Sequence, residues 1–346
     1  MELTPKISNA MLSKYTSKED KDQNYLDSHY IHTKEELDEV LKGLNQGRYY
    51  YRGVNNASFK MYASSQREWD DPNSVLRGLG QYDYRSAIQC LLEKTASLKE
   101  VRDYMSAEKV DYNEVFILAL MQHYGMPSPF IDFSNTLEKA LFFACDAAGK
   151  QDDDKKRELD DYVSLYYIGR NVDWMYTNVQ TVVKCGLERL DEQLVDLARK
   201  CGYTQDELKR ICEDEVCKIR TLQYSQFKPE DITFLTIGGP SLGVVKAAIS
   251  SVNFSCEYII INRRLLEQDG FFVFNNTLDK PLVEIMNGEY TRYFNCINIH
   301  KSLVHHIESE YLAPKGICRE SIYCEGDEVS DKLKEVIGTL KRELCL

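Results

Sequence analysis

The 346-residue chain lacks long apolar runs, a leader-like start and paired cysteines. A membrane-spanning helix needs about 20 mostly apolar residues, and the polar residues 1–6 do not resemble the apolar core of a secretory signal. The eleven cysteines are scattered singly, without a Cys-x-x-Cys pair, as is typical of reduced thiols. We therefore expect a cytoplasmic protein with no membrane contact and no bound metal.

Several signature loops are also missing. The chain has no Gly-x-Gly-x-x-Gly, no Gly-x-x-x-x-Gly-Lys and no Gly-x-Ser-x-Gly elbow. The glycine-rich segment 237–243 lacks the lysine of a phosphate loop, so we interpret it as an ordinary loop. The formal net charge of -12 disfavours general nucleic-acid or anionic-membrane binding, because both need a basic surface.

What is present is ordinary globular composition, with 43% hydrophobic and 28% charged residues. Residues 1–31 are polar and carry a charge run at 18–22, so we interpret them as an N-terminal arm or a loosely packed lead-in. The first firm element is expected at Thr33, which forms a capping box with Glu36 and starts a helix that ends at Gly47. We assign residues 32–346 to one domain.

The remaining pattern predicts an α+β fold with a mixed or antiparallel central sheet flanked by helices. The strongly charged segment 173–222 is interpreted as a helical insertion. Aromatic and β-branched runs predict strands at 48–54, 162–168, 233–237, 258–261 and 271–274. Apolar periodicity predicts helices at 83–106, 112–124, from 135 onward with Glu138 as a capping partner, and at 301–313 and 329–343.

The first candidate site is Tyr51-Arg52-Gly53, at the end of a predicted strand. A guanidinium fork suits phosphate or carboxylate, and a glycine lets a ligand approach the backbone closely. The alternative is a turn glycine next to a surface arginine.

Two further candidates lie later in the chain. His123 is expected in the last turn of an apolar helix, with Asp132 in the following loop as a partner, an arrangement that suits a general base or a fixed tautomer. The alternative is that His123 caps the end of its helix and Asp132 caps the start of the next helix. Gln268 precedes a buried strand, where ligand amides are often bound, and its alternative is an ordinary helix–strand junction.

In their order and spacing these segments resemble the FRG-domain family, named for its (Phe/Tyr)-Arg-Gly motif. The resemblance covers about residues 48–335. Two departures are Ser128-Pro129, where the family usually has Thr-Arg, and the altered ending at 323–327. The matching segments are 51–53, 63–67, 122–127, 131–134, 140–144, 264–272 and 315–323.

The resemblance implies one ligand pocket around Arg52 but carries no settled activity. By analogy with the motif order of ADP-ribosyltransferases, we hypothesise NAD as cofactor, bound by four residues: Arg52, Gly53, Ser64 and Arg67. Three others are assigned to catalysis: His123, Asp132 and Gln268. The analogy has a defect, because neither Glu267 nor Asp269 sits where the transferase glutamate should stand.

The alternative hypothesis is a non-catalytic module that senses a small-molecule or nucleotide ligand or binds a protein partner. The charged insertion at 173–222 would then be a partner surface, and bacterial phage defence is one setting for such a sensor.

Overall fold

The computed structural model describes residues 14–44, 48–71, 74–79, 84–107, 114–148, 157–169, 234–238, 244–248, 255–259, 270–275, 280–286, 292–323 and 326–346. In these ranges nine strands form one mixed sheet in the order β1-β9-β4-β2-β3-β8-β5-β6-β7. The strands are β1 (Asp27–Ile31), β2 (Tyr49–Val54), β3 (Phe130–Ser134), β4 (Tyr162–Gly169), β5 (Phe234–Gly238), β6 (Val244–Ala248), β7 (Ser255–Ile259), β8 (Gly270–Phe274) and β9 (Asn295–His300). The predicted α+β class is confirmed.

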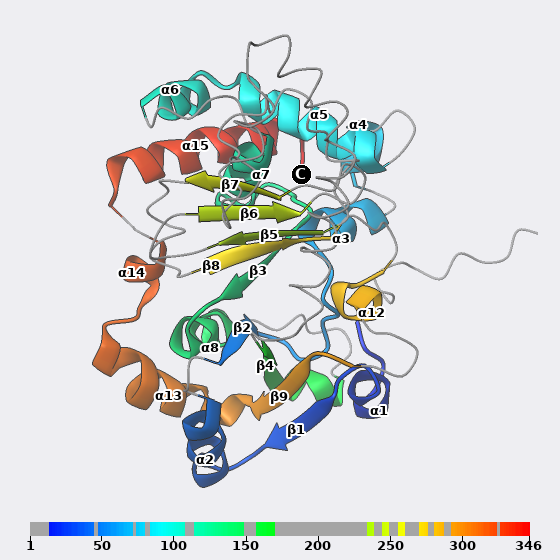
Figure 1. Cartoon of the computed structure of the whole chain (residues 1–346), viewed down its shortest axis with the longest axis vertical. Coiled ribbons are helices and arrows are strands. Elements are labelled where there is room, and N and C mark those ends of the chain that lie inside the picture. Colours follow the sequence, from blue (N-terminus) through cyan, green and yellow to red (C-terminus); the bar gives the residue numbers. More distant parts are fainter. Residues whose placement is uncertain are drawn as a thin grey trace, which may run out of the picture.

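Only one neighbouring pair in this sheet, β1 with β9, runs parallel, and the other described pairs are antiparallel. Figure 1 shows the sheet in two parts, with β8, β5, β6 and β7 above and β2, β4, β9 and β1 below, and with β3 between them. The two parts meet weakly, because β2 and β3 are paired at a single position, Tyr51 with Ser134.

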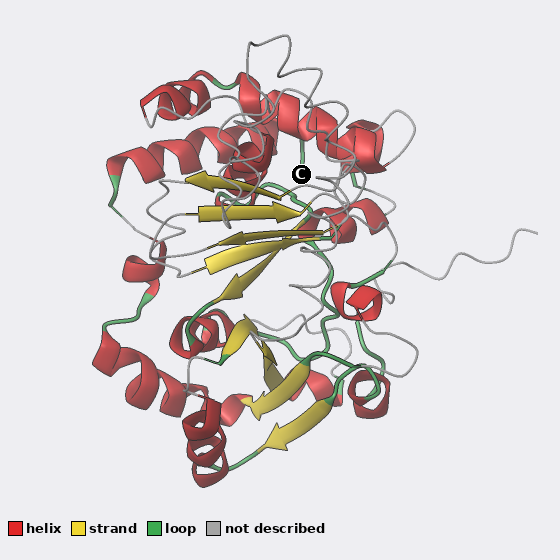
Figure 2. Cartoon of the chain, viewed as in Figure 1, coloured by secondary structure: helices red, strands yellow, loops and turns green. Residues whose placement is uncertain are grey.

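Helices cover the sheet in separate groups (Figure 2). They are α1 (Lys18–Asp22), α2 (Lys34–Leu44), α3 (Ser64–Asp70), α4 (Leu76–Leu79), α5 (Tyr84–Ser97), α6 (Lys99–Ala107), α7 (Glu114–His123), α8 (Leu137–Cys145), α12 (Leu282–Met286), α13 (Val304–Ile307), α14 (Arg319–Tyr323) and α15 (Glu328–Glu343). Short 3-10 turns lie at Glu158–Asp161, Lys301–Leu303 and Ala313–Lys315, and a π-helical turn lies at Glu308–Leu312.

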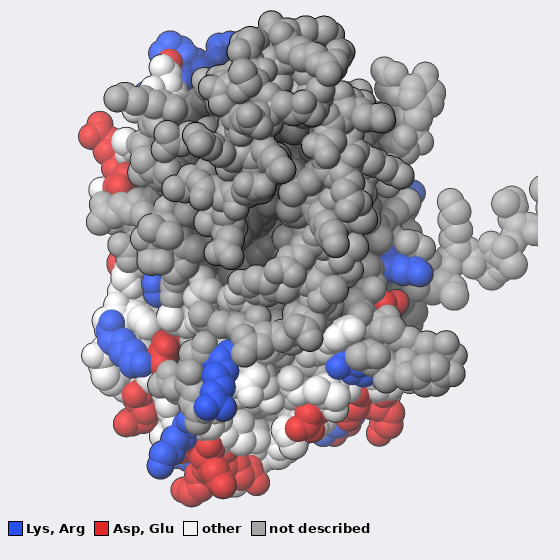
Figure 3. All heavy atoms as spheres, in the orientation of Figure 1, with Lys and Arg blue, Asp and Glu red and all other residues white. Residues whose placement is uncertain are grey.

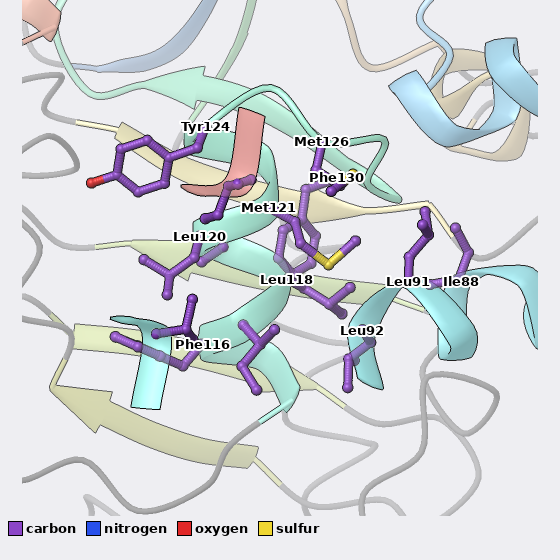
Figure 4. Close-up of a cluster of buried hydrophobic side chains, with 14 of the residues drawn as sticks. Ile88, Leu91, Leu92, Phe116, Leu118, Leu120, Met121, Tyr124, Met126 and Phe130 are labelled. Atoms are coloured by element: carbon purple, nitrogen blue, oxygen red, sulfur yellow. The ribbon is translucent and has the colours of Figure 1, made fainter. Parts of the chain in front are cut away.

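The buried side chains form three clusters whose positions follow from the strand period of two. Along β4, Val163 and Leu165 join the cluster under α2 and α8, whereas Tyr166 and Ile168 join the cluster on the opposite face. The third cluster packs α5, α7 and α15 against β3 and β8, and Figure 4 shows its α5 and α7 side chains around Phe130. The sheet is thus covered on both faces around β4.

Most predicted helices are confirmed with shifted bounds. Helix α2 has the expected capping box, in which Thr33 N donates to Glu36 Oε2 (3.2 Å) and Glu36 N donates to Thr33 Oγ1 (3.3 Å). The predicted helix at 83–106 is two helices that meet at Leu98. Helix α8 begins after Thr136, and Glu138 forms an ion pair with Lys315 rather than capping the helix.

The described part of the N-terminal segment is not the loosely packed lead-in that its polarity predicted. Strand β1 is an edge strand of the sheet, and Lys21 of α1 is fully buried. Its ammonium donates to Ala57 O and Ser164 Oγ, both at 2.7 Å, and to Tyr166 Oη at 3.2 Å. A lysine can be buried when all three of its donors find acceptors, so here a charged residue serves as a core residue.

Three more strands, β3, β6 and β9, were not predicted. Strand β9 reads as polar because of its asparagines, yet Asn298 is fully buried and its side chain accepts from Ser164 Oγ at 2.8 Å. Strand β6 was not predicted between the expected strands on either side of it. The predicted helical insertion at 173–222 and the helix end at Gly47 lie outside the described residues.

The charged surface mixes both signs where the structure describes it. Figure 3 shows acidic and basic side chains interspersed on the lower part of the face in view, around α2 and β1. In the described ranges, moreover, no helix combines the length and the apolar character needed to span a bilayer.

Helix α8 lies directly on the backbone of β2 at Gly53. A Cβ atom added there would lie 1.8 Å from Ala140 O and 2.6 Å from Ala144 N. Both alanines are fully buried and are four residues apart, so they share the helix face that meets the strand. The glycine of the Tyr-Arg-Gly motif is therefore required by the close packing of a helix on a strand.

We expect Gly53→Ala to destabilise the protein by about 3 kcal/mol or more, because backbone atoms of α8 would have to move. Thermal or urea unfolding measures the change. Gly43→Ala is the matched control, since Gly43 has open space around its Cβ position and alanine should stabilise this exposed site in α2 by about 0.5–1 kcal/mol. Equal stability of wild type and Gly53→Ala would contradict the packing role.

Candidate functional site

A cavity of about 440 Å³ lies where β2 and β3 separate. Its volume falls within the usual range of small-molecule sites, roughly 300–1,000 Å³. Residues predicted from the sequence border it, and they come from β2, α3, α7 and β3: Arg52, Gly53, Arg67, His123 and Asp132. The structure therefore brings five of the seven predicted site residues to one cavity.

Arg52 bridges the opening between the two strands. Its Nη1 donates to the backbone oxygen of Asp132 at 2.5 Å and lies 3.9 Å from Asp132 Oδ2. The side chain is 17% exposed, and its Nε is buried without a hydrogen-bond partner among the described residues. Burial lowers the pKa of Arg52, and the Asp132 carboxylate opposes this. The guanidinium thus retains an unused donor beside the cavity.

Asp132 lies in strand β3, not in the loop that the sequence predicted. Its side chain is 42% exposed where it borders the cavity. The partial removal of Asp132 from water raises its pKa, while the charge of Arg52 and a hydrogen bond from Gln122 act in the opposite direction. Gln122 Nε2 donates to Asp132 Oδ2 at 2.6 Å. Sequence reasoning missed the role of Gln122, although this residue opens the same motif as His123.

In the segment Gln122-His123-Tyr124-Gly125, the first two side chains border the cavity and the tyrosine packs in the core. The His123 ring borders the cavity and meets Phe272 edge-on, with centroids 5.0 Å apart. Tyr124 instead reaches Ser330 of α15, at 3.4 Å between hydroxyl oxygens. Gly125 has a φ of +78°, the left-handed conformation in which glycine commonly ends a helix. Helix α7 thus ends with the two residues that it presents to the cavity, Gln122 and His123.

Arg67 is the second guanidinium of the cavity. It comes from α3, and its Nη1 donates to Tyr62 O at 2.6 Å. Burial lowers the pKa of Arg67, and the neighbouring positive charge of Arg52 lowers it further. Two guanidinium groups therefore repel each other next to one carboxylate, Asp132, which leaves this end of the cavity positive.

The other predicted site residues have different outcomes. Ser64 does not border the cavity, because its hydroxyl group donates to Ser128 O at 3.1 Å and accepts from Ser128 N at 3.0 Å. This bond pair holds the start of α3 to the loop before β3. Gly53 borders the cavity, but α8 covers the side where a Cβ would lie. Gln268 lies outside the described residues.

Fold and site together define an α+β protein with a cationic cavity at a split in its sheet. Residues 47–153 match the family model of the FRG domain, so the chain contains an FRG domain. The match includes Arg52, Arg67, Gln122, His123 and Asp132. Neither the search of curated proteins nor the search of solved structures found a match. Within the described residues, no group of three or more His, Cys, Asp or Glu side chains could hold a metal ion.

We expect the pKa of Asp132 to rise further in Arg52→Met and, by a smaller amount, in Gln122→Leu, because each change removes an interaction that favours the carboxylate. A carboxyl ¹³C NMR titration of each folded variant measures this. Asp103→Asn, which removes an exposed carboxylate on α6, is the control and should leave the Asp132 titration unchanged. An unchanged or lower pKa in Arg52→Met would refute the electrostatic coupling.

The raised pKa of Asp132 makes the free energy of unfolding depend on pH. The native carboxyl binds its proton more tightly than the unfolded chain does, so its contribution to the free energy of unfolding is fully present below the unfolded-chain pKa. That contribution is lost as the pH rises through the higher native pKa. The ionised form of Asp132 is therefore less favourable in the folded protein than in the unfolded chain. Perturbed pKa values of this kind are more common at functional sites than elsewhere.

Proposed function

We propose that the cavity binds a phosphate-bearing nucleotide, with NAD as the leading candidate, and that its phosphates lie between Arg52 and Arg67. The observation that carries this proposal is how the two guanidinium groups are held. Each has an Nη1 that donates to a backbone oxygen, of Asp132 and Tyr62 respectively. A neutral acceptor does not cancel the charge of an arginine, and the nearby carboxylate, Asp132, faces two guanidinium groups. Guanidinium donors bind phosphate oxygens well.

With NAD in the cavity, the arrangement suits ADP-ribosyltransferase-like chemistry. When the bond between ribose and nicotinamide breaks, nicotinamide leaves with the bonding electrons and positive charge develops on the ribose. A fixed carboxylate stabilises such a charge. Asp132, held by Gln122, supplies this group in place of the transferase glutamate that the sequence around Gln268 lacks. His123 is then the base that accepts the proton of the attacking nucleophile.

The second candidate is the non-catalytic sensor. One observation favours it: the cavity wall includes Tyr323 of α14, which lies far outside residues 47–153. A ligand that touches both segments can change how they pack, without any reaction. The two candidates share the same phosphate site and differ only in whether a bond is broken.

We expect isothermal titration to show binding of NAD and ADP by the wild-type protein and at least tenfold weaker binding by Arg52→Met. A hydrogen bond to a charged group contributes roughly 1.5–3 kcal/mol, and 1.4 kcal/mol corresponds to a tenfold change. Arg102→Met is the control, because Arg102 is an exposed arginine on α6 that does not border the cavity. No heat and no thermal shift at millimolar NAD and ADP would end the proposal.

The chemistry is tested separately by nicotinamide release. For Asp132→Asn we expect NAD binding to persist while release falls by about 100-fold, as is typical when one stabilising group of a transition state is lost. Asparagine retains an oxygen that can accept the bond from Gln122. Binding without any nicotinamide release by the wild-type protein, with or without added acceptor protein, would favour the sensor.

A further inference from the structure

Part of the cavity wall is formed by the aromatic rings of two helices. Phe143 of α8 and Tyr323 of α14 both border the cavity, and their ring centroids lie 6.5 Å apart in an edge-to-face arrangement. Helix α8 is otherwise almost entirely buried, and Phe143 is only partly so. Two aromatic rings in a cavity wall offer a surface on which a flat ring can stack.

Asp146 holds this aromatic wall in place. Its Oδ2 accepts a hydrogen bond from Tyr323 Oη at 3.0 Å, and its Oδ1 pairs with Arg319 Nη1. The Arg319 guanidinium also lies over the Tyr323 ring, 5.0 Å from the centroid. One carboxylate thus ties two side chains of α14 to the end of α8, and the tyrosine ring is fixed on one face and at its hydroxyl.

A hydrogen bond ties the aromatic wall to the chain just after the strand that carries Arg52. Asn55 Nδ2 donates to the backbone oxygen of Asp146 at 3.1 Å, and Asn55 follows the last residue of β2. Arg52, Phe143 and Tyr323 all border the same cavity. One cavity thus offers both features that a nucleotide needs, guanidinium donors for its phosphates and an aromatic surface for its ring.

We propose that Tyr323 and Phe143 bind the planar ring of the nucleotide and that Asp146 positions Tyr323 for it. The inference rests on the proposed function, because it assigns the second half of the same ligand. Tyr323 and Asp146 are then specificity-determining and positioning residues respectively. A ligand with phosphates alone uses only the guanidinium groups, whereas a nucleotide uses the aromatic wall as well.

The test compares two probes, ADP and inorganic pyrophosphate, by isothermal titration with each variant. Stacking of a base on an aromatic side chain is typically lost on substitution by alanine with an effect of about tenfold or more in affinity. We therefore expect Tyr323→Ala to weaken ADP binding by about tenfold and to leave pyrophosphate binding unchanged. Phe143→Leu, which keeps an apolar side chain but removes the ring, should act in the same direction and provides the test if Tyr323→Ala does not fold.

Two further variants separate the ring from its support. Tyr323→Phe keeps the ring and removes its bond to Asp146, so ADP binding should weaken less than in Tyr323→Ala. Asp146→Asn removes the charge that pairs with Arg319 and leaves the Tyr323 ring, so ADP binding should again weaken less than in Tyr323→Ala. Tyr311→Phe is the control, since it removes a tyrosine–aspartate bond of 2.6 Å, to Asp38, outside the cavity.

The outcomes distinguish this inference from the proposed function. If the wild-type protein binds neither probe, the phosphate site is wrong and both fall. If it binds both probes and Tyr323→Ala and Phe143→Leu leave ADP binding unchanged, the ring site alone is wrong. An equal loss for ADP and pyrophosphate in these variants would also overturn the ring site, because it would show a general disturbance of the cavity.

Discussion

The site depends on one interaction, the hydrogen bond from the Arg52 guanidinium to the backbone oxygen of Asp132 across the gap between β2 and β3. The strands share a single paired position, so backbone groups beyond it need other partners. A side chain that supplies such a partner occupies the place of a missing ladder bond. The gap is stable for this reason, and it remains wide enough to form a cavity beside a charged group.

The second constraint is the packing of α8 on β2. Because Gly53 has no side chain, the backbone of α8 approaches the strand directly, and Phe143 and Asp146 reach the same cavity as Arg52. Adjacent residues of one motif therefore have different tasks. Arg52 contributes charge to the cavity, and Gly53 allows the helix that forms the opposite wall to come close.

Charge explains why the cavity differs from the rest of the protein. The chain as a whole is acidic, with a net charge of -12, yet Arg52 and Arg67 meet at one end of the cavity with Asp132 as the nearby carboxylate. Residues from several elements are needed to build this local excess. Those at the positive end belong to the FRG domain match at 47–153, whereas Tyr323 of the aromatic wall does not.

The sequence by itself determined the α+β class, the capping box of α2, the strand that carries Arg52 and the candidate residues Arg52, Arg67, His123 and Asp132. These features depend on periodicity, capping and motif order, which are patterns of residues close together in the sequence. The tertiary structure alone decided which residues meet. Gln122 donates a hydrogen bond to Asp132, Ser64 bonds the loop before β3, and the polar strand β1 pairs with β9. Such contacts join residues far apart in the chain, so no local pattern encodes them.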